Sequence, residues 1–223
     1  MTTGVAILDM DGTLLSKRSI DVFCTELDLT RRLAEVDALS PNLPPYKTSE
    51  MIASFFKAVP RRTLERLQDT IPVNKGADGF VRFLKSEGFL VAIATDSYQF
   101  LAEKLARSLG ADTAYGNVVE IHDGHLTGRL LTDHRCLKVE GCREYSTCKL
   151  WFMRGLAGRS RGLTVAVGDG DSDFCAISVA DIGIAYRPKT DSIATVADMV
   201  GSDFSQIESW LQGKIAARRN QSR

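Results

Sequence analysis

A run of four apolar residues, 5–8, leads directly into the acidic segment DMDGT at residues 9–13. An unbroken apolar run of this length is typical of a strand in a parallel sheet that is buried on both faces. Side chains two positions apart on a strand point the same way, so Asp9 and Asp11 are expected to share one face at its carboxyl end. Two carboxylates this close repel each other, and a proton or a cation must neutralise one of them. A strand followed by an ordinary polar turn is the alternative interpretation.

Apolar runs recur along the rest of the chain and alternate with helical patterns. Further strands are predicted at residues 89–95, 163–167, 182–185 and 199–200. Helices are predicted around residues 77–87 and 98–109, from 149 onward and from 204 onward. Strands that alternate with helices predict an α/β fold, a Rossmann-like parallel sheet with helices on both faces. Ligands of such sheets bind at the carboxyl ends of the strands, which is where Asp9 and Asp11 lie.

The segment after the first strand has a different character. Between residues 15 and 74 the strand-like runs disappear, and helices are predicted to begin near Ser19, Thr30, Thr48 and Pro60. Together they make a small helical bundle inserted into the α/β unit. The predicted organisation is therefore a core of residues 1–15 and 77–223 with an inserted helical domain at 16–76. Helices that merely decorate the core are the alternative.

Acidic residues also follow the strand at 163–167, in the segment GDGDSD at residues 168–173. Oxygen ligands at the carboxyl end of a strand favour a hard cation such as Mg²⁺. A carboxylate such as Asp9 is ionised at neutral pH and can attack phosphorus without a base. A second carboxyl, Asp11, can protonate the leaving oxygen and then take a proton from water. A cation would screen the phosphate charge from the attacking anion.

The segment DMDGTL resembles the first motif of the haloacid dehalogenase superfamily. Three later segments resemble its other motifs in the right order, so the likeness covers nearly the whole chain. It is closest to the phosphoserine phosphatase group, which carries a helical cap between the first two motifs. The resemblance implies that Asp9 is the nucleophile and that Asp11 is the general acid and base. Because dehalogenase members lack the second aspartate, Asp11 argues for a phosphatase.

The later motifs supply the other candidate site residues by resemblance. Thr95 would bind phosphate, with Gly12 and Asp96 as further candidate contacts. Lys149 would span the charges of nucleophile and phosphate, with Arg143 as a fallback. The Mg²⁺ ligands that the resemblance implies are Asp9, Asp11 through its backbone carbonyl, Asp169 and Asp173. Asp173 would alternatively support Lys149 or a metal-bound water, and Asp171 has no assigned role.

The resemblance breaks at two places that bear on substrate choice. Phosphoserine phosphatases have two glycines after the phosphate-binding hydroxyl, where this chain has Asp96 and Ser97. Asp96 would either point away from phosphate or meet a cationic part of the substrate. Those enzymes also pair the substrate ammonium with a glutamate, and direct counting from Asp9 places Arg18 there. We therefore predict that phosphoserine is a poor substrate and that an acidic or hydroxylated leaving group is better.

Other cap residues also bear on substrate specificity. In those enzymes an arginine of the cap holds the substrate carboxylate. That arginine aligns here with Met51 or Ile52, shortly before the apolar Phe55. Phe55 is therefore a second candidate specificity residue beside Arg18. Gaps in the cap would alternatively bring Asp21 or Glu26 into the glutamate's role.

A β-hairpin is predicted around Asp123-Gly124, a strong two-residue turn signal, and a DGxLTG hairpin also occurs here in phosphoserine phosphatases. The following stretch contains His134, Cys136, Cys142 and Cys148. These could bind zinc, but gaps of six residues between the cysteines do not match the usual close ligand pairs. Five cysteines in a chain of 223 residues favour reduced thiols in a cytoplasm over a disulfide framework.

Composition narrows the possible partners. Lys+Arg and Asp+Glu number 28 each, so there is no basic excess to favour nucleic acid. No apolar run approaches the length that spans a membrane, and no leader sequence is recognisable, so a cytoplasmic protein is expected. A monomer and a homodimer both remain open.

The predicted function is Mg²⁺-dependent hydrolysis of a small phosphomonoester through an aspartyl phosphate. Three alternatives remain open. A phosphotransferase would pass the phosphoryl group to an alcohol, and a phosphosugar mutase would need a bisphosphate activator. A binding protein would keep the fold without catalysis, although all four motifs carry the residue types that catalysis requires.

Overall fold

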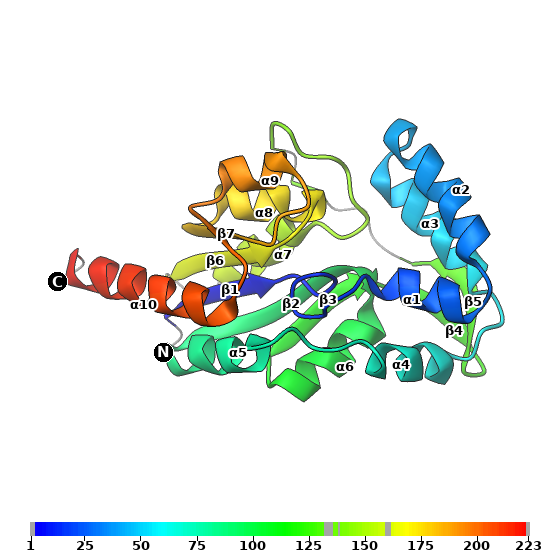
Figure 1. Ribbon diagram of the computed structural model, residues 1–223, viewed down its shortest axis with the longest axis horizontal. Coiled ribbons are helices and arrows are strands. Elements are labelled where there is room, and N and C mark those ends of the chain that lie inside the picture. The colour runs from blue at the N-terminus through cyan, green and yellow to red at the C-terminus, as the bar shows by residue number, and fades with distance from the viewer. Residues whose placement is uncertain (1–2, 132–135, 138, 159–161, 222–223) are drawn as a thin grey trace.

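The computed structural model describes residues 3–131, 136–137, 139–158 and 162–221, with the side chains of 219–221 left out (Figure 1). Six parallel strands form the central sheet in the order β3-β2-β1-β6-β7-β8. Their bounds are β1 Gly4–Leu8, β2 Phe89–Tyr98, β3 Thr113–Asn117, β6 Leu163–Gly168, β7 Ile182–Tyr186 and β8 Met199–Gly201. Every residue of β1 is buried, as its apolar run predicted. β1 pairs with β2 on one side and β6 on the other, so the acidic segments after β1 and β6 meet.

Helices cover both faces of the sheet, as predicted (Figure 1). One face carries α5 Ala77–Ser86, α6 Gln99–Leu109 and α10 Phe204–Gln221, and the other carries α7 Lys149–Ala157, α8 Phe174–Val179 and α9 Asp191–Val196. Two sequence predictions differ in detail. β2 continues to Tyr98, three residues beyond the predicted end at Thr95, with an irregular register after Ala94. The edge strand β3 was not predicted, because its sequence TAYGN lacks an apolar run.

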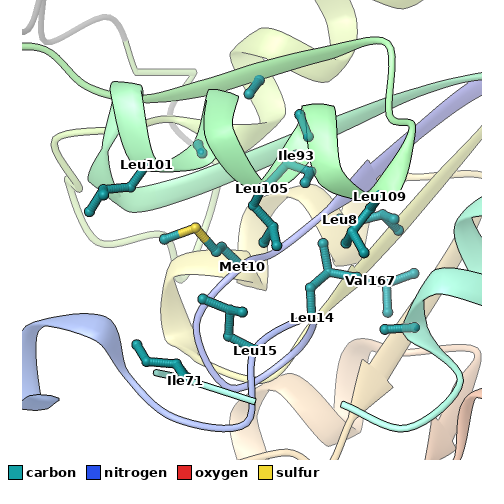
Figure 2. Close-up of a cluster of buried hydrophobic side chains, with 14 of the residues drawn as sticks. Leu8, Met10, Leu14, Leu15, Ile71, Ile93, Leu101, Leu105, Leu109 and Val167 are labelled. Atoms are coloured by element: carbon teal, nitrogen blue, oxygen red, sulfur yellow. The ribbon is translucent and has the colours of Figure 1, made fainter. Parts of the chain in front are cut away.

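The apolar residues around the first acidic segment hold it in place. Side chains alternate here: Leu8 and Met10 point into the core (Figure 2), whereas Asp9 and Asp11 line the same cavity. Leu14 and Leu15, which follow the turn, are also buried in this cluster. Burying each such side chain stabilises the fold by about 1.5–3 kcal/mol. These apolar contacts therefore hold the loop that carries the two aspartates against the core.

The inserted segment forms helices α1 Ser19–Glu26, α2 Thr30–Leu39, α3 Pro45–Phe55 and α4 Arg61–Asp69, with a short 3-10 turn η1 Ser40–Asn42. The third helix starts at Pro45 rather than Thr48. Proline is well suited to the first helical turn, where its missing N–H is not needed. Ser19, expected as a cap, is instead the first helical residue and turns its hydroxyl toward Asp11.

The predicted hairpin is present as β4 Val119–His122 and β5 His125–Leu130. Asp123 and Gly124 both have positive φ, 48° and 75°, as a tight two-residue hairpin turn requires. The hairpin hydrogen-bonds to the inserted segment, with Ala58 donating to the Leu126 carbonyl at 2.8 Å. The helical insertion therefore contacts a hairpin from the second half of the chain, beside α3 in Figure 1. The division at residues 16–76 stays a prediction.

The cysteines depart from the expectation of reduced thiols. Cys142 and Cys175, 33 positions apart, form a disulfide between the loop before α7 and the first turn of α8. Cys24 and Cys148 are buried thiols. Cysteine spacing alone could not indicate this pair, because the pairing depends on which loop folds over α8. Among the described residues, no helix is long and apolar enough to cross a bilayer.

Candidate active site

A cavity of about 490 Å³ opens at the carboxyl ends of β1, β2 and β6. Asp9, Thr95 and Asp169, from the ends of these three strands, all line it. Residues of α1 and α3 form the opposite wall, so the inserted helices face the strand ends across the cavity. The sheet topology thus brings the acidic segments and the predicted phosphate-binding segment into one site.

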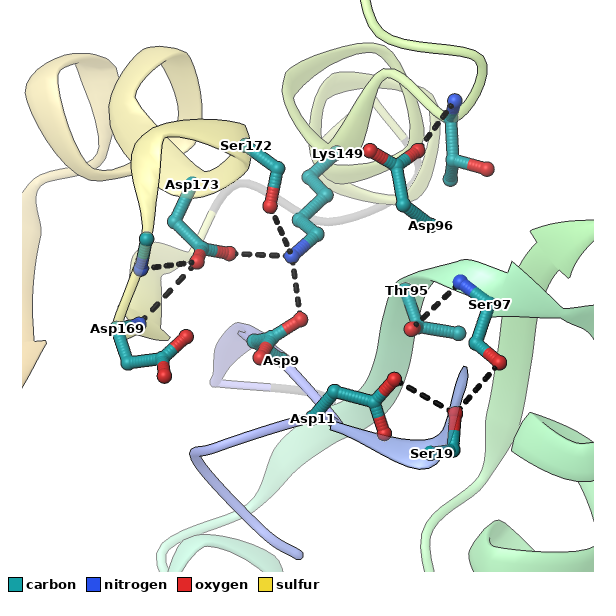
Figure 3. A network of polar contacts seen from close by, with 12 residues as sticks. Asp9, Asp11, Ser19, Thr95, Asp96, Ser97, Lys149, Asp169, Ser172 and Asp173 are labelled. Carbon is teal, nitrogen blue, oxygen red and sulfur yellow. Dashed lines mark hydrogen bonds and ion pairs between the residues drawn. The ribbon is translucent and has the colours of Figure 1, made fainter. Parts of the chain in front are cut away.

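The centre of the site is a buried charge network (Figure 3). The ammonium of Lys149 donates to Asp9 Oδ1 and to Asp173 Oδ1, both at 2.5 Å. The side chain of Lys149 is 1% exposed, and those of Asp9 and Asp173 are 6% and 3% exposed. Burial alone would lower the pKa of Lys149, but the charges of Asp173 and Asp9 together raise that pKa above its ordinary value. Lys149, rather than the fallback Arg143, therefore reaches the predicted nucleophile.

Asp169 and Asp173 have different surroundings although they are neighbours in sequence. Asp173 Oδ2 accepts hydrogen bonds from the backbone N–H groups of Asp169 and Gly170, at 3.2 and 3.1 Å. With Lys149 on its other oxygen, Asp173 mainly supports the network. Asp169 turns toward the cavity. One oxygen each from Asp9, Asp169 and Asp173 lies within 4.8 Å of the others, a spacing that could hold a metal ion.

Asp11 lies beside Asp9 and accepts a hydrogen bond from the hydroxyl of Ser19 at 2.7 Å. Its other oxygen, Oδ1, is buried without a partner among the described residues. Burial, followed by the charge of Asp9, raises the pKa of Asp11 from 3.8 to about 7. A carboxyl that titrates near neutral pH can both give and take a proton, which fits the predicted general acid and base.

Gly12 explains how the two acidic loops approach each other. Its φ is +90°, a conformation that favours glycine. A Cβ there would lie only 1.9 Å from Asp169 Oδ2. The glycine is therefore needed both for the turn and for the space that Asp169 occupies. Whether its backbone also contacts phosphate stays a prediction.

The second predicted motif is close to the expected position. Thr95 is 1% exposed, lines the cavity, and accepts a hydrogen bond from the Ser97 N–H at 3.0 Å. It lies within β2, four residues before α6 begins at Gln99, rather than directly at a helix N-terminus. Its role as a phosphate ligand stays a prediction.

Asp96 has a structural use that the sequence did not indicate. Its Oδ1 accepts hydrogen bonds from the Ser146 hydroxyl at 3.1 Å and the Thr147 N–H at 3.0 Å. Burial raises its pKa above the ordinary value. Asp96 thus ties the end of β2 to the loop that leads into Lys149. Of the two positions considered for this side chain, the one directed away from phosphate agrees better with these contacts.

The two candidate specificity residues lie in different places. Arg18 lines the cavity and pairs with Asp21 at 3.2 Å and Asp37 at 3.6 Å. The ring of Phe55 instead packs under the guanidinium of Arg32, 4.3 Å from the ring centroid. Ile52, three residues earlier on α3, lines the cavity. The structure therefore favours Ile52 over Phe55 as the α3 residue that faces a substrate.

Several cavity residues were not singled out from the sequence. Asn117 is a buried polar residue, and Tyr145 and Lys189 lie on loops at the carboxyl ends of the strands. Asn117 donates to the Asp96 carbonyl at 2.6 Å. No local pattern marks these positions, because each is brought in by tertiary structure.

The possible zinc site gains no support. The sulfur of Cys142 is in the disulfide, and His134 lies outside the described residues.

A model of the haloacid dehalogenase-like hydrolase family matches residues 6–178. Phosphoserine phosphatase of Archaeoglobus fulgidus is 30% identical over 198 residues, which cover 86% of this chain and 54% of that relative. The chain thus spans about half the length of that enzyme. Phosphoserine phosphatase of Streptococcus thermophilus is 30% identical over 191 residues, covering 83% of this chain and 85% of the relative.

A solved structure described as a phospho-aspartyl intermediate analogue of phosphoserine phosphatase is also similar. It has a TM-score of 0.78 and 24% sequence identity, and the match covers 94% of this chain and 99% of the other. The likeness confirms the predicted fold.

Proposed function

Because the chain belongs to the haloacid dehalogenase-like hydrolase family, we propose that it is a Mg²⁺-dependent phosphatase that acts through an aspartyl phosphate on Asp9. Membership confirms the family predicted from the sequence. The observation that carries the proposed chemistry is the buried network in which Lys149 holds Asp9 beside Asp11. The phosphoserine phosphatase relatives support a small phosphomonoester as substrate.

In the first half-reaction an oxygen of Asp9 attacks phosphorus and the bond from phosphorus to the leaving oxygen breaks. Asp11 gives its proton to that oxygen, so the product leaves as an alcohol. Its raised pKa of about 7 keeps a substantial protonated fraction near neutral pH. Lys149 keeps its donor on Asp9 and fixes the orientation of the carboxylate.

In the second half-reaction water attacks phosphorus of the aspartyl phosphate. Asp11, now ionised, takes a proton from that water, and the bond between phosphorus and the Asp9 oxygen breaks. Inorganic phosphate is released and both aspartates return to their starting states. One residue thus serves as acid and then as base, as the reversal of proton flow requires.

The residues present fit a hard divalent cation. The candidate donors are carboxylate oxygens of Asp9 and Asp169, and the oxygens of the cluster that includes Asp173 lie within 4.8 Å of one another. Mg²⁺ prefers such oxygen donors. When bound, Mg²⁺ would neutralise phosphate charge as the nucleophile approaches. Asp173, with both oxygens already hydrogen-bonded, would act mainly by holding Lys149 and the Asp169 backbone.

Metal removal gives the first prediction. We expect exhaustive treatment with EDTA to abolish hydrolysis and added Mg²⁺ to restore it, because carboxylates and a phosphate dianion otherwise repel one another. Ca²⁺ should inhibit, since its looser and larger coordination shell misplaces the nucleophile. Phosphate release after dialysis is the measurement. Full activity in chelated protein would contradict the proposal.

Substrate choice gives the second prediction. Arg18 lies in the cavity wall, where its charge would repel an ammonium group on the leaving group. Loss of pairing with a buried charge costs about 2–5 kcal/mol, which is roughly thirtyfold to several thousandfold in kcat/KM. We therefore expect phosphoserine to be a much poorer substrate than 3-phosphoglycerate, which has a hydroxyl in place of the ammonium.

A kinetic comparison of the two compounds, repeated with Arg18→Glu, separates charge from shape. The variant should improve phosphoserine relative to 3-phosphoglycerate. If phosphoserine gives the highest kcat/KM with the unmodified protein, the proposed role of Arg18 is wrong, although phosphatase activity itself would stand.

A further inference from the structure

A second lysine contacts the acidic cluster at Asp169, whereas Lys149 pairs with Asp9 and Asp173. The ammonium of Lys189 lies 2.8 Å from Asp169 Oδ2. The Lys189 side chain is 55% exposed, whereas that of Asp169 is 6% exposed. The ion pair therefore joins a buried carboxylate to a flexible cation at the wall of the cavity.

This ammonium also lies close to the loop that carries Asp9 and Asp11. A Cβ built on Gly12 would lie 1.9 Å from Asp169 Oδ2 and 3.0 Å from Lys189 Nζ. The carboxylate oxygen and the ammonium thus lie together above the Gly12 backbone, next to Asp11 in the chain. A cation bound to Asp169 on this side would compete with Lys189 for the same oxygen.

The charges at the centre of the site explain why Lys189 pairs with Asp169. The four carboxyl groups at the centre, Asp9, Asp11, Asp169 and Asp173, face two ammonium groups, Lys149 and Lys189. Lys149 is committed to Asp9 and Asp173, which leaves Lys189 as the cation on Asp169. Lys149 is buried, whereas the side chain of Lys189 is 55% exposed and can turn into solvent when another cation takes its place on the buried Asp169 carboxylate.

We propose that Lys189 is a resident counter-ion of Asp169 and that a divalent cation displaces it on binding. The inference rests on the metal site of the proposed function and deepens it, because it makes metal binding an exchange of one cation for another. Lys189 holds the buried carboxylate while the metal is absent and leaves it when the metal arrives.

Asp171 acquires a role in this arrangement. Its Oδ1 accepts hydrogen bonds from the hydroxyls of Thr190 at 2.6 Å and Ser192 at 2.7 Å. The Lys189 N–H also donates to the Asp169 carbonyl at 2.8 Å. The backbone N–H of Lys189 and the hydroxyls of Thr190 and Ser192 are therefore held, while the Lys189 side chain can change partners. Asp171 is a positioning residue for this exchange.

Metal binding to the substrate-free protein tests the proposal without using turnover. Isothermal titration calorimetry with Mg²⁺ alone would compare the unmodified chain with Lys189→Met and Lys189→Arg. Lys214→Met, which removes a lysine that lies over Trp210 on α10, is the matched control. We expect Lys189→Met to lower the Kd for Mg²⁺ about fivefold, because no ion pair must be broken. Lys189→Arg and Lys214→Met should stay within about twofold of the unmodified chain.

Thermal unfolding supplies a second readout. Without metal, Lys189→Met should lower Tm by about 2–4 °C, because Asp169 loses its counter-ion, and saturating Mg²⁺ should remove this difference. A Tm deficit that persists equally in Mg²⁺ would overturn the proposal and indicate a purely structural role.

The calorimetric titration can also overturn the proposed exchange of Lys189 for Mg²⁺. An unchanged or weaker Mg²⁺ affinity in Lys189→Met, or equal tightening in either comparison variant, would overturn the exchange. If the unmodified chain binds Mg²⁺ normally in that case, the proposed phosphatase mechanism is unaffected. If the unmodified chain binds no Mg²⁺ at all, both proposals fail.

Discussion

Asp9→Asn is expected to reduce kcat by several orders of magnitude while the protein remains folded. The amide keeps the shape of the side chain and can still accept a hydrogen bond from Lys149, but it lacks the negative charge that attacks phosphorus. A group that forms the covalent intermediate supplies a large part of the rate enhancement. Steady-state phosphate release by the purified variant is the measurement, with circular dichroism as the check on folding.

Asp123→Asn is the matched control for this change. Asp123 lies at the hairpin tip, where its side chain is 88% exposed, and asparagine tolerates its positive φ. The control should keep full activity. Turnover by folded Asp9→Asn within tenfold of the unmodified enzyme would refute the assignment of the nucleophile.

Lys149→Met is expected to have the largest effect on stability. The substitution leaves Asp9 and Asp173 buried without their cation. Breaking a buried ion pair by removing one partner costs about 3–5 kcal/mol, which is a large share of the stability of a single domain. Denaturant unfolding should therefore show a much lower midpoint, and turnover should be lost as well.

The pH dependence of this loss distinguishes charge from packing. Burial raises the pKa of Asp173, and the charge of Lys149 opposes that rise, so the variant should raise the folded-state pKa further. The unfolded-state pKa of an aspartate is near 4, and the folded-state pKa of Asp173 is higher. A group of this kind contributes fully to stability below its unfolded-state pKa, and that contribution is lost as pH rises through the folded-state pKa. The stability deficit should thus be larger at pH 8 than at pH 5.

A charge-neutral variant completes the test. Lys149→Met combined with Asp9→Asn and Asp173→Asn removes the unpaired carboxylates and should recover much of the lost stability. A deficit that is independent of pH and persists in this triple variant would contradict the electrostatic explanation and indicate lost packing.

Much of the site follows from the chain sequence because its key residues lie at the ends of buried strands. The apolar runs of β1 and β6 are readable from the sequence, and parallel pairing brings Asp9 and Asp169 to the same edge. The alternation of side chains also places Asp11 beside Asp9. These relations depend on local periodicity and on a sheet topology with few alternatives.

The remaining features depend on contacts between segments far apart in the chain. Asp96 accepts hydrogen bonds from Ser146 and Thr147 in the loop before α7. Lys189 reaches Asp169 from the loop after β7. The disulfide between Cys142 and Cys175 likewise requires a particular loop to cover α8. No composition or spacing in these segments indicates their partners, since tertiary packing alone decides them.

Trapping the covalent intermediate tests the central claim most directly. Asp11→Asn would be mixed with p-nitrophenyl phosphate, whose leaving group does not need a proton, so the first step should proceed while hydrolysis of the aspartyl phosphate stalls. Acid quenching and borohydride reduction would convert an acyl phosphate to homoserine, which peptide mass spectrometry locates. We predict a burst of about one equivalent of nitrophenolate per site and homoserine at position 9. A burst accompanied by modification at any other residue, or steady turnover without modification of Asp9, would contradict the mechanism.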